Sequence, residues 1–318
     1  MILDVDNLTI RFPFGRELRP VVRGVSFQVA PGEILGVVGE SGCGKSITNL
    51  AVLGLLPPGA QVTADRFALC GQDLLAVGRR DWPTVRGSKV AMIFQNPMSA
   101  LNPSLTIGTQ LIESVRKADP ALGRRQREAR AIELLEQVGI GAAALRLKSY
   151  PHELSGGMAQ RAMIAMALAS RPALLIADEP TTALDVTIQA QILDLLDRLR
   201  RDNGMSVILV SHDIGVVQQY ADRIQVMYSG EIVETGPIGQ VTQTPSHPYT
   251  RALLQSLPGR VGARPKTPLV TIRGMVPPIE LAIEGCRFAS RCDRAEAQCQ
   301  DRPPVARRTA DSWVRCHL

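Results

Sequence analysis

Aromatic residues are scarce in this chain, and long apolar runs are missing. Aromatic side chains make up 4% of its 318 residues. Proteins that bind single-stranded nucleic acid stack its bases on aromatic rings, so we expect no such platform here. No apolar stretch approaches the roughly 20 residues that a membrane-spanning helix requires. The opening residues, MILDVD, also lack the basic segment and apolar core of a secretory signal. We therefore expect a globular protein that is cytosolic or faces the cytosol.

The net charge of +6 is unevenly distributed along the chain. Residues 259–318 contain eleven Lys and Arg against six Asp and Glu, so residues 1–258 are close to neutral. A near-neutral body argues against a nucleic-acid groove across it. Hydrophobic residues make up 45% of the chain, which is enough for a sizeable core, and the length predicts about two domains.

Residues 39–46 (GESGCGKS) fit the pattern GxxxxGK(S/T) without a gap. An apolar run at 34–38 predicts a strand before them, and leucine spacing at 47–56 predicts a helix after them. Glycines let backbone N–H groups turn inward on a phosphate, and a helix N-terminus adds partial positive charge. In this setting a turn that binds nothing is the weaker interpretation. We expect nucleotide contacts from Gly39, Glu40, Ser41, Gly42, Cys43, Gly44, Lys45, Ser46 and Ile47, with Lys45 on the β- and γ-phosphates and Ser46 on Mg²⁺.

A second glycine pair follows Ser155 and precedes a predicted helix at 160–170. Ser155, Gly156 and Gly157 could form another anion-binding nest, or Ser155 could simply cap the helix. One nucleotide seldom needs two nests in one chain. The second nest therefore predicts contact with a nucleotide held by a neighbouring subunit.

Two adjacent acids close the apolar strand predicted at 173–177. Burying carboxylates is costly, so solvated turn acids are the alternative to a functional pair. Adjacent strand residues point to opposite sides, which would let Asp178 hold Mg²⁺ while Glu179 polarises an attacking water. His212 ends the strand predicted at 206–211 and could donate a hydrogen bond to a γ-phosphate oxygen. Asp185 is placed to cap the helix predicted at 186–202.

Alternation and apolar spacing predict further strands at 2–10, 21–29 and 89–94, and helical structure over 104–147. Phe12 lies at the end of the first strand, either as a core aromatic or as a ring that lies against adenine. Gln95 directly follows the strand at 89–94, and alone it says little.

Six short motifs, in their order along the chain, resemble the motif series of ABC-type ATPases over about residues 1–258. They are GESGCGKS, Gln95, LSGGM, LLIADEP, ALD and SHD. FQNPMSALNPSLTIG and HPYTRALLQSLP are similar to the peptide/nickel importer branch. The resemblance implies an α/β P-loop NTPase core with an antiparallel β subdomain and a helical insert at about 100–170.

The resemblance also implies roles for single residues. Phe12 would stack on adenine, Ser155 and Gly157 of the partner would contact the γ-phosphate, and Asp185 would contact the nucleotide. Asp178 would be the Walker B acid, Glu179 the base and His212 the switch histidine. Gln95 would link Mg²⁺ to a membrane subunit.

The proline-rich, basic tail at 259–318 predicts a linker followed by a small extension. The extension holds four of the six cysteines, Cys286, Cys292, Cys299 and Cys316, without the CxxC pairs of common zinc sites. Their clustering favours a shared metal, and resemblance to dipeptide-type relatives implies a 4Fe–4S cluster. Zinc and unligated thiols are the alternatives. Cys43 and Cys70 are predicted to be packing residues.

Three functional classes fit these observations. The first is the ATPase of a peptide importer, with nickel, glutathione or opines as other cargoes. This class implies ATP and Mg²⁺ as cofactors. Its partners would be two transmembrane permeases, a second ATPase subunit and a solute-binding protein, with no nucleic acid. The chain would lie peripherally on the cytoplasmic face of a bacterial membrane. The second is an ABC ATPase acting on DNA or ribosomes, which would require coiled-coil inserts or a tandem ATPase body. The third is a metal-dependent regulator whose working part is the tail.

Overall fold

The computed structural model describes residues 1–182, 184–257, 271–279, 281–308 and 311–318. Two predicted features lie partly outside these residues. The ALD motif is described without Ala183, and the predicted linker without most of its length, including Pro265 and Pro268.

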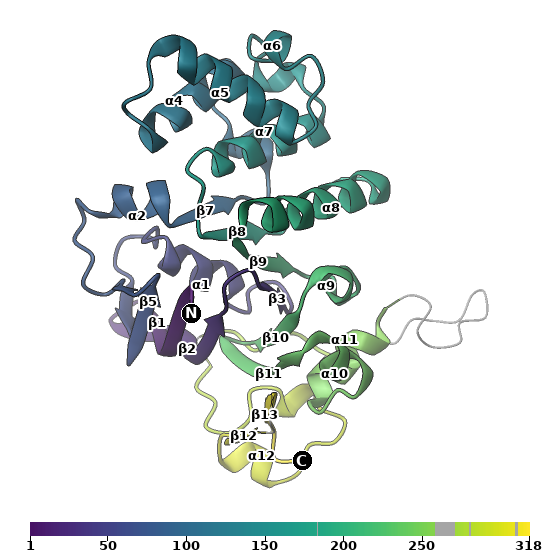
Figure 1. The fold of residues 1–318 in the computed structure, drawn as a ribbon. Coiled ribbons are helices and arrows are strands. Elements are labelled where there is room, and N and C mark those ends of the chain that lie inside the picture. Colours follow the sequence, from purple (N-terminus) through teal and green to yellow (C-terminus); the bar gives the residue numbers. More distant parts are fainter. Residues whose placement is uncertain (183, 258–270, 280, 309–310) are drawn as a thin grey trace.

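An antiparallel sheet forms from the N-terminal part of the chain (Figure 1). Its strand order is β2-β1-β5-β6, and β4 also pairs with β1. The strands are β1 (Leu3–Phe14), β2 (Glu17–Val29), β4 (Gln61–Thr63), β5 (Arg66–Leu69) and β6 (Gln72–Asp73). The predicted strands at 2–10 and 21–29 are therefore longer than expected, because β1 and β2 continue pairing as far as Phe14 and Glu17.

The central sheet is mixed, with a parallel core and an antiparallel edge. Its order is β12-β13-β11-β10-β3-β9-β8-β7, and the pairs from β10 to β7 are parallel. The strands are β3 (Ile34–Val38), β7 (Val90–Ile93), β8 (Leu174–Asp178), β9 (Ser206–Ser211), β10 (Arg223–Tyr228), β11 (Glu231–Pro237), β12 (Ala306–Arg308) and β13 (Trp313–Arg315). Every residue of β3, β8 and β9 is buried. Parallel strands covered on both faces read as continuous apolar runs, which is why these three strands were predictable.

The helices divide between the sheet and a separate helical subdomain. Those near the sheet are α1 (Lys45–Val52), α2 (Trp82–Ser88), α8 (Val186–Asn203), α9 (Ile214–Tyr220), α10 (Ile238–Gln243) and α11 (Pro248–Gln255). The subdomain holds α3 (Pro97–Ala100), α4 (Ile107–Ala118), α5 (Arg124–Gln137), α6 (Ala143–Arg146), η1 (Pro151–Glu153) and α7 (Gly156–Leu168), and α4 to α7 lie at the top of Figure 1. One apolar core joins this subdomain to the central sheet, and a second lies between the two sheets. The predicted P-loop NTPase architecture is confirmed.

Several helix boundaries differ from prediction for local reasons. Helix α1 begins two residues earlier than expected and ends before Gly54, whose φ of 60° is left-handed. Helix α7 begins at Gly156 rather than at 160, because Ser155 caps it. The helical region predicted at 104–147 is three helices, α4, α5 and α6.

The C-terminal extension contributes to the central sheet, which the sequence did not predict. Strand β13 pairs antiparallel with β11, and β12 pairs with β13. The short helices η2 (Ala289–Arg291) and α12 (Gln298–Asp301) carry the cysteine region. Pro248 starts α11, a position where its missing N–H costs nothing. Cys70 is exposed in the β5–β6 turn rather than packed, so that prediction was wrong.

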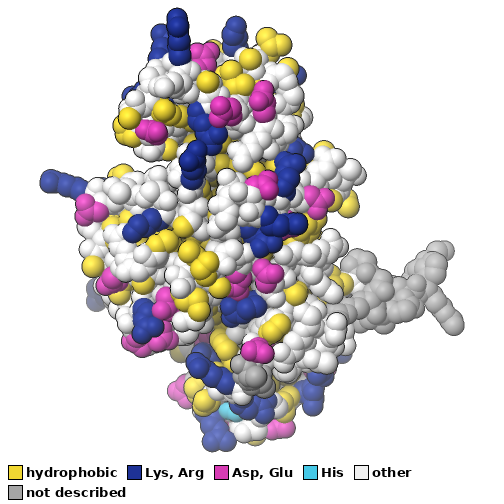
Figure 2. All heavy atoms as spheres, viewed as in Figure 1, with side chains coloured by type: hydrophobic (Ala, Val, Ile, Leu, Met, Phe, Trp, Pro, Cys, Tyr) yellow, Lys and Arg dark blue, Asp and Glu magenta, His cyan; other side chains and the backbone are white. Residues whose placement is uncertain are grey.

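No helix among the described residues is long and apolar enough to cross a membrane. On the face seen in Figure 2, Lys and Arg side chains are interspersed with Asp and Glu. That face therefore presents charges of both signs.

Candidate functional site

The stretch 39–46, predicted to be an anion cradle, connects β3 to the beginning of α1. Gly44 caps α1 with φ of 101°, a left-handed value that favours glycine. A Cβ at Gly39 would collide with the Met227 carbonyl oxygen and lie 2.8 Å from the Cys43 sulfur. Glycine is therefore required at both positions for the loop to pack against the sheet while it turns into the helix.

Lys45 is buried beneath this loop, with 6% of the residue exposed. Its ammonium donates hydrogen bonds to the carbonyl oxygens of Gly39 at 2.7 Å and Glu40 at 3.1 Å. A buried ammonium requires such acceptors, and here they fix the charge beneath the N-terminus of α1. Cys43 is also buried, which raises the pKa of its thiol and keeps it in the neutral form.

Asp178 ends β8 beside Ser46, so two of the three predicted Mg²⁺ ligands lie together, whereas the third, Gln95, donates to Glu179. Asp178 is 7% exposed, and its Oδ1 has no hydrogen-bond partner. Burial raises the pKa of this carboxyl, the charge of Glu179 raises it further, and the Ser46 hydroxyl and Lys45 oppose the rise. A buried carboxylate oxygen without a partner, beside a serine hydroxyl, fits a divalent cation with oxygen ligands.

Glu179 follows the last residue of β8 and contacts a different set of residues from Asp178. Its Oε2 accepts hydrogen bonds from Gln95 Nε2 at 2.7 Å and Thr182 Oγ1 at 3.0 Å. His212 Nδ1 lies 3.4 Å from the same oxygen. Two predicted residues, Gln95 after β7 and His212 after β9, therefore converge on the Glu179 carboxylate after β8. Thr182 was not predicted, although it lies three residues after Glu179.

A cavity of about 680 Å³ opens over the phosphate loop. Its lining includes Phe12, the stretch Ser41 to Ile47, Gln95 and Glu179. Phe12 thus lies where a nucleotide base could be stacked. Phe14 and Arg19 also line the cavity and were missed, although they belong to the same strand pair as Phe12.

Ser155, Gly156, Gly157 and Asp185 do not line this cavity. The Ser155 hydroxyl accepts a bond from the Met158 N–H at 3.3 Å, and Asp185 caps α8 through the Ile188 N–H at 2.9 Å. A Cβ added at Gly157 would lie 3.0 Å from Ile188, so the beginnings of α7 and α8 adjoin. Ser155, Gly156 and Asp185 are exposed there. The predicted residues therefore form two separate groups, one lining the cavity and one exposed at the beginnings of α7 and α8.

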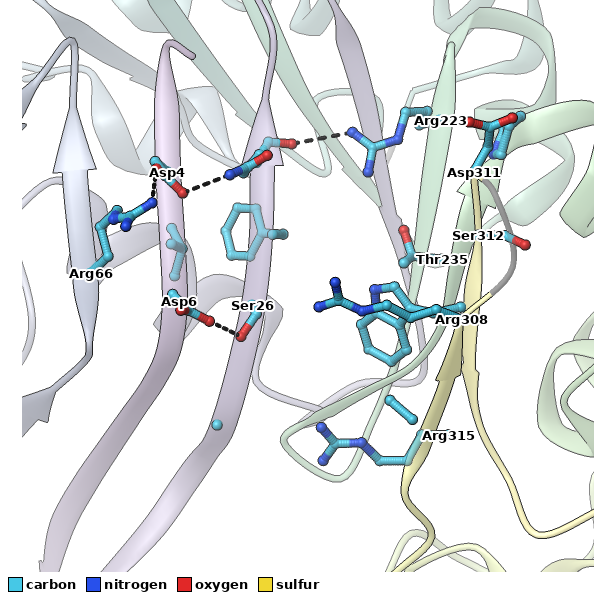
Figure 3. A pocket seen from close by; sticks show the side chains of 17 residues that line it. Asp4, Asp6, Ser26, Arg66, Arg223, Thr235, Arg308, Asp311, Ser312 and Arg315 are labelled. Atoms are coloured by element: carbon cyan, nitrogen blue, oxygen red, sulfur yellow. Dashed lines mark hydrogen bonds and ion pairs between the residues drawn. The ribbon is translucent and has the colours of Figure 1, made fainter.

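A second cavity of about 720 Å³ separates β1 and β2 from the extension (Figure 3). Several of its polar groups are already paired. Arg66 bonds Asp4, Ser26 donates to Asp6, and Arg223 pairs with Glu33. None of the predicted site residues lines it. The nucleotide site is therefore assigned to the cavity over the phosphate loop.

The four cysteines of the extension come from separate segments but lie near one another. The amide of Cys286 donates to the Cys299 carbonyl at 2.7 Å, and Cys316 directly follows β13. Burial raises the pKa of Cys286 to about 11, and the thiolate charges of the other three raise it as well. Among the described residues, however, no three His, Cys, Asp or Glu side chains are placed to hold a metal ion.

The chain resembles known proteins in sequence over nearly its whole length. The ABC transporter family profile matches residues 22–182, and the profile of the oligopeptide/dipeptide transporter C-terminal region matches 233–299. The dipeptide transport ATP-binding protein DppD of Escherichia coli is 45% identical over 99% of this chain and 96% of its own. A putative peptide import ATP-binding protein of Brucella abortus is 46% identical over 99% of this chain and 94% of its own.

Solved structures agree with the fold. The ATP-binding cassette MJ0796, in a dimeric post-hydrolysis state bound to ADP and phosphate, matches with a TM-score of 0.64 and 28% identity. The match covers 74% of this chain and 98% of that one. The structure of cbiO1 from Clostridium perfringens, part of the ABC transporter complex cbiONQ, has a TM-score of 0.66 and 26% identity, and the match covers 76% of this chain and 91% of that one. The chain belongs to the ABC transporter family, in its oligopeptide/dipeptide branch.

Proposed function

We propose that this chain is the ATP-hydrolysing subunit of a multi-subunit importer of peptides. The observation that carries the proposal is the convergence of Gln95 and His212 on Glu179, beside a phosphate loop in which the buried Lys45 and the exposed Ser46 adjoin Asp178. The peptide-import names of relatives that are about 45% identical over nearly the whole chain support the cargo class.

In this proposal, the triphosphate lies on the backbone N–H groups and Lys45 of the phosphate loop, with the base against Phe12. Asp178 and Ser46 would hold Mg²⁺, which supplies charge neutralisation at the phosphates when bound. Glu179 accepts a hydrogen bond from the attacking water and orients it. Gln95 and His212, which both contact the Glu179 carboxylate, position that group and place donors beside the γ-phosphate.

Each nucleotide is completed by a second ATPase subunit. The exposed turn at Ser155 and Gly156 would approach the γ-phosphate of the partner's nucleotide, and charge-assisted hydrogen bonds to that phosphate favour the closed pair. Loss of the γ-phosphate on hydrolysis removes this differential affinity, so the pair opens. The exposed Val186, at the adjoining start of α8, supplies apolar surface for the same contact.

The permease contact is proposed at an apolar groove beside Gln95. The groove encloses about 360 Å³ between the central sheet and the helical subdomain, and Met92, Phe94, Leu101 and Met166 are among its lining residues. Phe94 is 40% exposed, although it adjoins the catalytic Gln95. Opening and closing of the ATP site would shift a permease segment bound in this groove. In this proposal the chain lies on the cytoplasmic face of a membrane, and a separate solute-binding protein captures the cargo.

The decisive variant is Glu179→Gln. Because the amide keeps the size of the side chain but cannot act as a base, we expect ATP turnover to fall by about 100-fold or more while ATP binding persists. The closed ATPase pair should then accumulate with Mg-ATP, as measured by size-exclusion chromatography with light scattering. The matched control is Glu296→Gln, an exposed acid of the extension, which should hydrolyse ATP at the wild-type rate. Wild-type turnover in Glu179→Gln would refute the assigned base.

We also propose that Cys286, Cys292, Cys299 and Cys316 hold a 4Fe–4S cluster, with zinc as the other candidate. Support comes from the mutual electrostatic influence of their thiols and from the thiolate chemistry that both groups require. Anaerobic purification followed by visible absorption, iron and zinc analysis tests the site. A colourless protein with stoichiometric zinc would exclude the cluster, and a metal-free protein would exclude both.

A further inference from the structure

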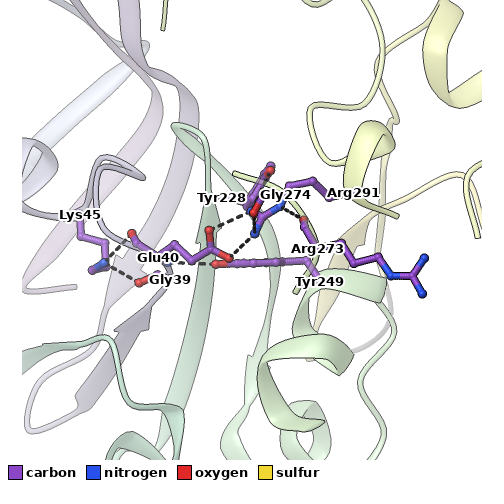
Figure 4. A network of polar contacts seen from close by, with 8 residues as sticks. All are labelled: Gly39, Glu40, Lys45, Tyr228, Tyr249, Arg273, Gly274 and Arg291. Carbon is purple, nitrogen blue, oxygen red and sulfur yellow. Dashed lines mark hydrogen bonds and ion pairs between the residues drawn. The ribbon is translucent and has the colours of Figure 1, made fainter. Parts of the chain in front are cut away.

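One side chain of the extension reaches the phosphate loop directly (Figure 4). Arg291, at the end of η2, forms a two-pronged ion pair with Glu40, its Nη1 and Nη2 lying 2.8 and 3.1 Å from the two carboxylate oxygens. The Arg291 side chain is 5% exposed, against 26% for that of Glu40. The two residues are 251 positions apart in the sequence. Arginine forms planar, two-pronged pairs with carboxylates that lysine cannot reproduce.

The rest of the Arg291 side chain is fixed as well. Its Nε donates to the Arg273 carbonyl at 2.8 Å, and Nη2 also donates to the Gly274 carbonyl at 3.3 Å. Nη1 lies 3.3 Å from the Tyr228 hydroxyl, and the guanidinium lies over the Tyr228 ring, 5.7 Å from its centre. Every nitrogen of the fork therefore has a partner. The guanidinium is a rigid anchor rather than a solvated charge.

Glu40 has further contacts, which connect Arg291 to Lys45. Its amide donates to the Tyr249 hydroxyl at 2.9 Å, and its carbonyl accepts the ammonium of Lys45 at 3.1 Å. Tyr249 packs against Tyr228, and both contact Phe288 of the extension. A continuous series of contacts therefore runs from the extension through Glu40 to the lysine proposed to bind phosphate.

Two physical effects follow from this arrangement. Residues 39–46 include three glycines, which raise the conformational freedom of the loop, so an external anchor reduces the cost of ordering it around a ligand. In addition, an unpaired carboxylate in a loop that receives a polyphosphate would repel it, and Arg291 neutralises that carboxylate.

We propose that Arg291 is a positioning residue for nucleotide binding, which makes the extension part of the ATP site. It acts through Glu40 and touches no phosphate itself. The inference rests on the proposed function in that it takes ATP as the ligand of the loop.

The test is a double-substitution cycle with steady-state ATPase kinetics and ATP binding. Arg291→Met should raise KM and Kd for Mg-ATP by about tenfold, with kcat within about twofold of wild type. Arg291→Lys should give an intermediate KM, because it restores the charge without the fork. In a Glu40→Gln background, adding Arg291→Met should change KM by less than about twofold. Arg307→Met, an exposed arginine on β12, is the matched control and should bind like wild type.

An unchanged KM in Arg291→Met would overturn the proposal, as would a full tenfold loss in the Glu40→Gln background. Should Arg291→Met fold poorly by circular dichroism, the Arg291→Lys and Glu40→Gln pair carries the same comparison. Failure of the wild-type protein to bind Mg-ATP would instead refute the proposed function.

Discussion

At the scale of single residues, Glu179 combines a left-handed backbone conformation with a carboxylate that accepts several hydrogen bonds. Its φ of 48° is left-handed, which costs a non-glycine residue about 1–2 kcal/mol. The surrounding structure holds it there, because its amide donates to the Val210 carbonyl at 3.0 Å and its carboxylate accepts from Gln95 and Thr182. Such strain is typical of functional sites and supports the role proposed for this carboxylate.

His247 is a second residue with a distinct physical signature. It is 1% exposed, its Nδ1 accepts the Tyr249 N–H at 3.0 Å, and burial lowers its pKa to about 4. Protonation would place a hydrogen on the accepting nitrogen and break that bond. The unfolded chain takes up the proton near pH 6.5, so the stability contributed by neutral His247 is complete above that pH and is lost as the pH falls towards 4.

We therefore expect the free energy of unfolding to fall by about 3 kcal/mol from this residue alone between pH 7 and pH 4. Urea denaturation measured from pH 7 to pH 5 follows the effect, and comparison with His247→Gln separates it from buried Glu234, whose pKa burial raises. His247→Gln should flatten the slope, although its stability at pH 7 will be lower. His152→Gln, at an exposed position, should keep the wild-type slope. An identical slope in His247→Gln would assign the acid sensitivity to other groups.

The residues that could be predicted are those whose chemistry is local. The spacing of Gly39, Gly44 and Lys45 itself describes a phosphate loop, and an acid that ends a buried strand implies a function. Arg291 and Tyr249 were missed as contacts of that loop, because no local pattern pairs them with Glu40. Only the folded chain brings those positions together.

At the scale of secondary-structure elements, strand β3 and helix α9 pack with almost no space between them. A Cβ added at Gly36 would collide with Val217 and lie 3.1 Å from the Ala221 Cβ. The close approach positions β3, whose end leads into the phosphate loop. Continuous apolar runs made β3, β8 and β9 predictable, whereas β12 and β13 have three residues each and no readable alternation.

Gly36→Ala should lower the free energy of unfolding by about 1–3 kcal/mol, because the added methyl group forces α9 away from the sheet. Chemical denaturation monitored by circular dichroism measures the change. Gly239→Ala, in α10, is the matched control, since its added Cβ meets nothing within 4 Å. Equal stability of the two variants would show that α9 accommodates the methyl group freely.

At the scale of the whole molecule, the extension is built into the ATPase body. Strand β13 extends the central sheet, and Phe288 is 3% exposed among Tyr228 and Tyr249 of the main core. A shared sheet and a shared core predict a single cooperative unfolding transition. This integration could not be foreseen, because prolines and clustered cysteines indicated a separate appendage.

Phe288→Ala should therefore lower the midpoint of the whole transition, with a loss of about 3 kcal/mol or more. In a Trp82→Phe background, fluorescence of Trp313 reports the extension while far-UV circular dichroism reports the body, and the two curves should coincide. Met275→Ala, at a side chain that is 88% exposed, should leave the midpoint unchanged. A Trp313 transition at lower temperature than the dichroism would mean that the extension unfolds by itself.

The extension and the helical subdomain lie at opposite ends of the molecule (Figure 1). A fluorescent label, affinity tag or antibody fragment attached to the extension would therefore leave the helical subdomain unobstructed. Attachment at the extension could also be used to immobilise the protein on a surface. Domain movements could then be followed optically from the far end while the assembly works.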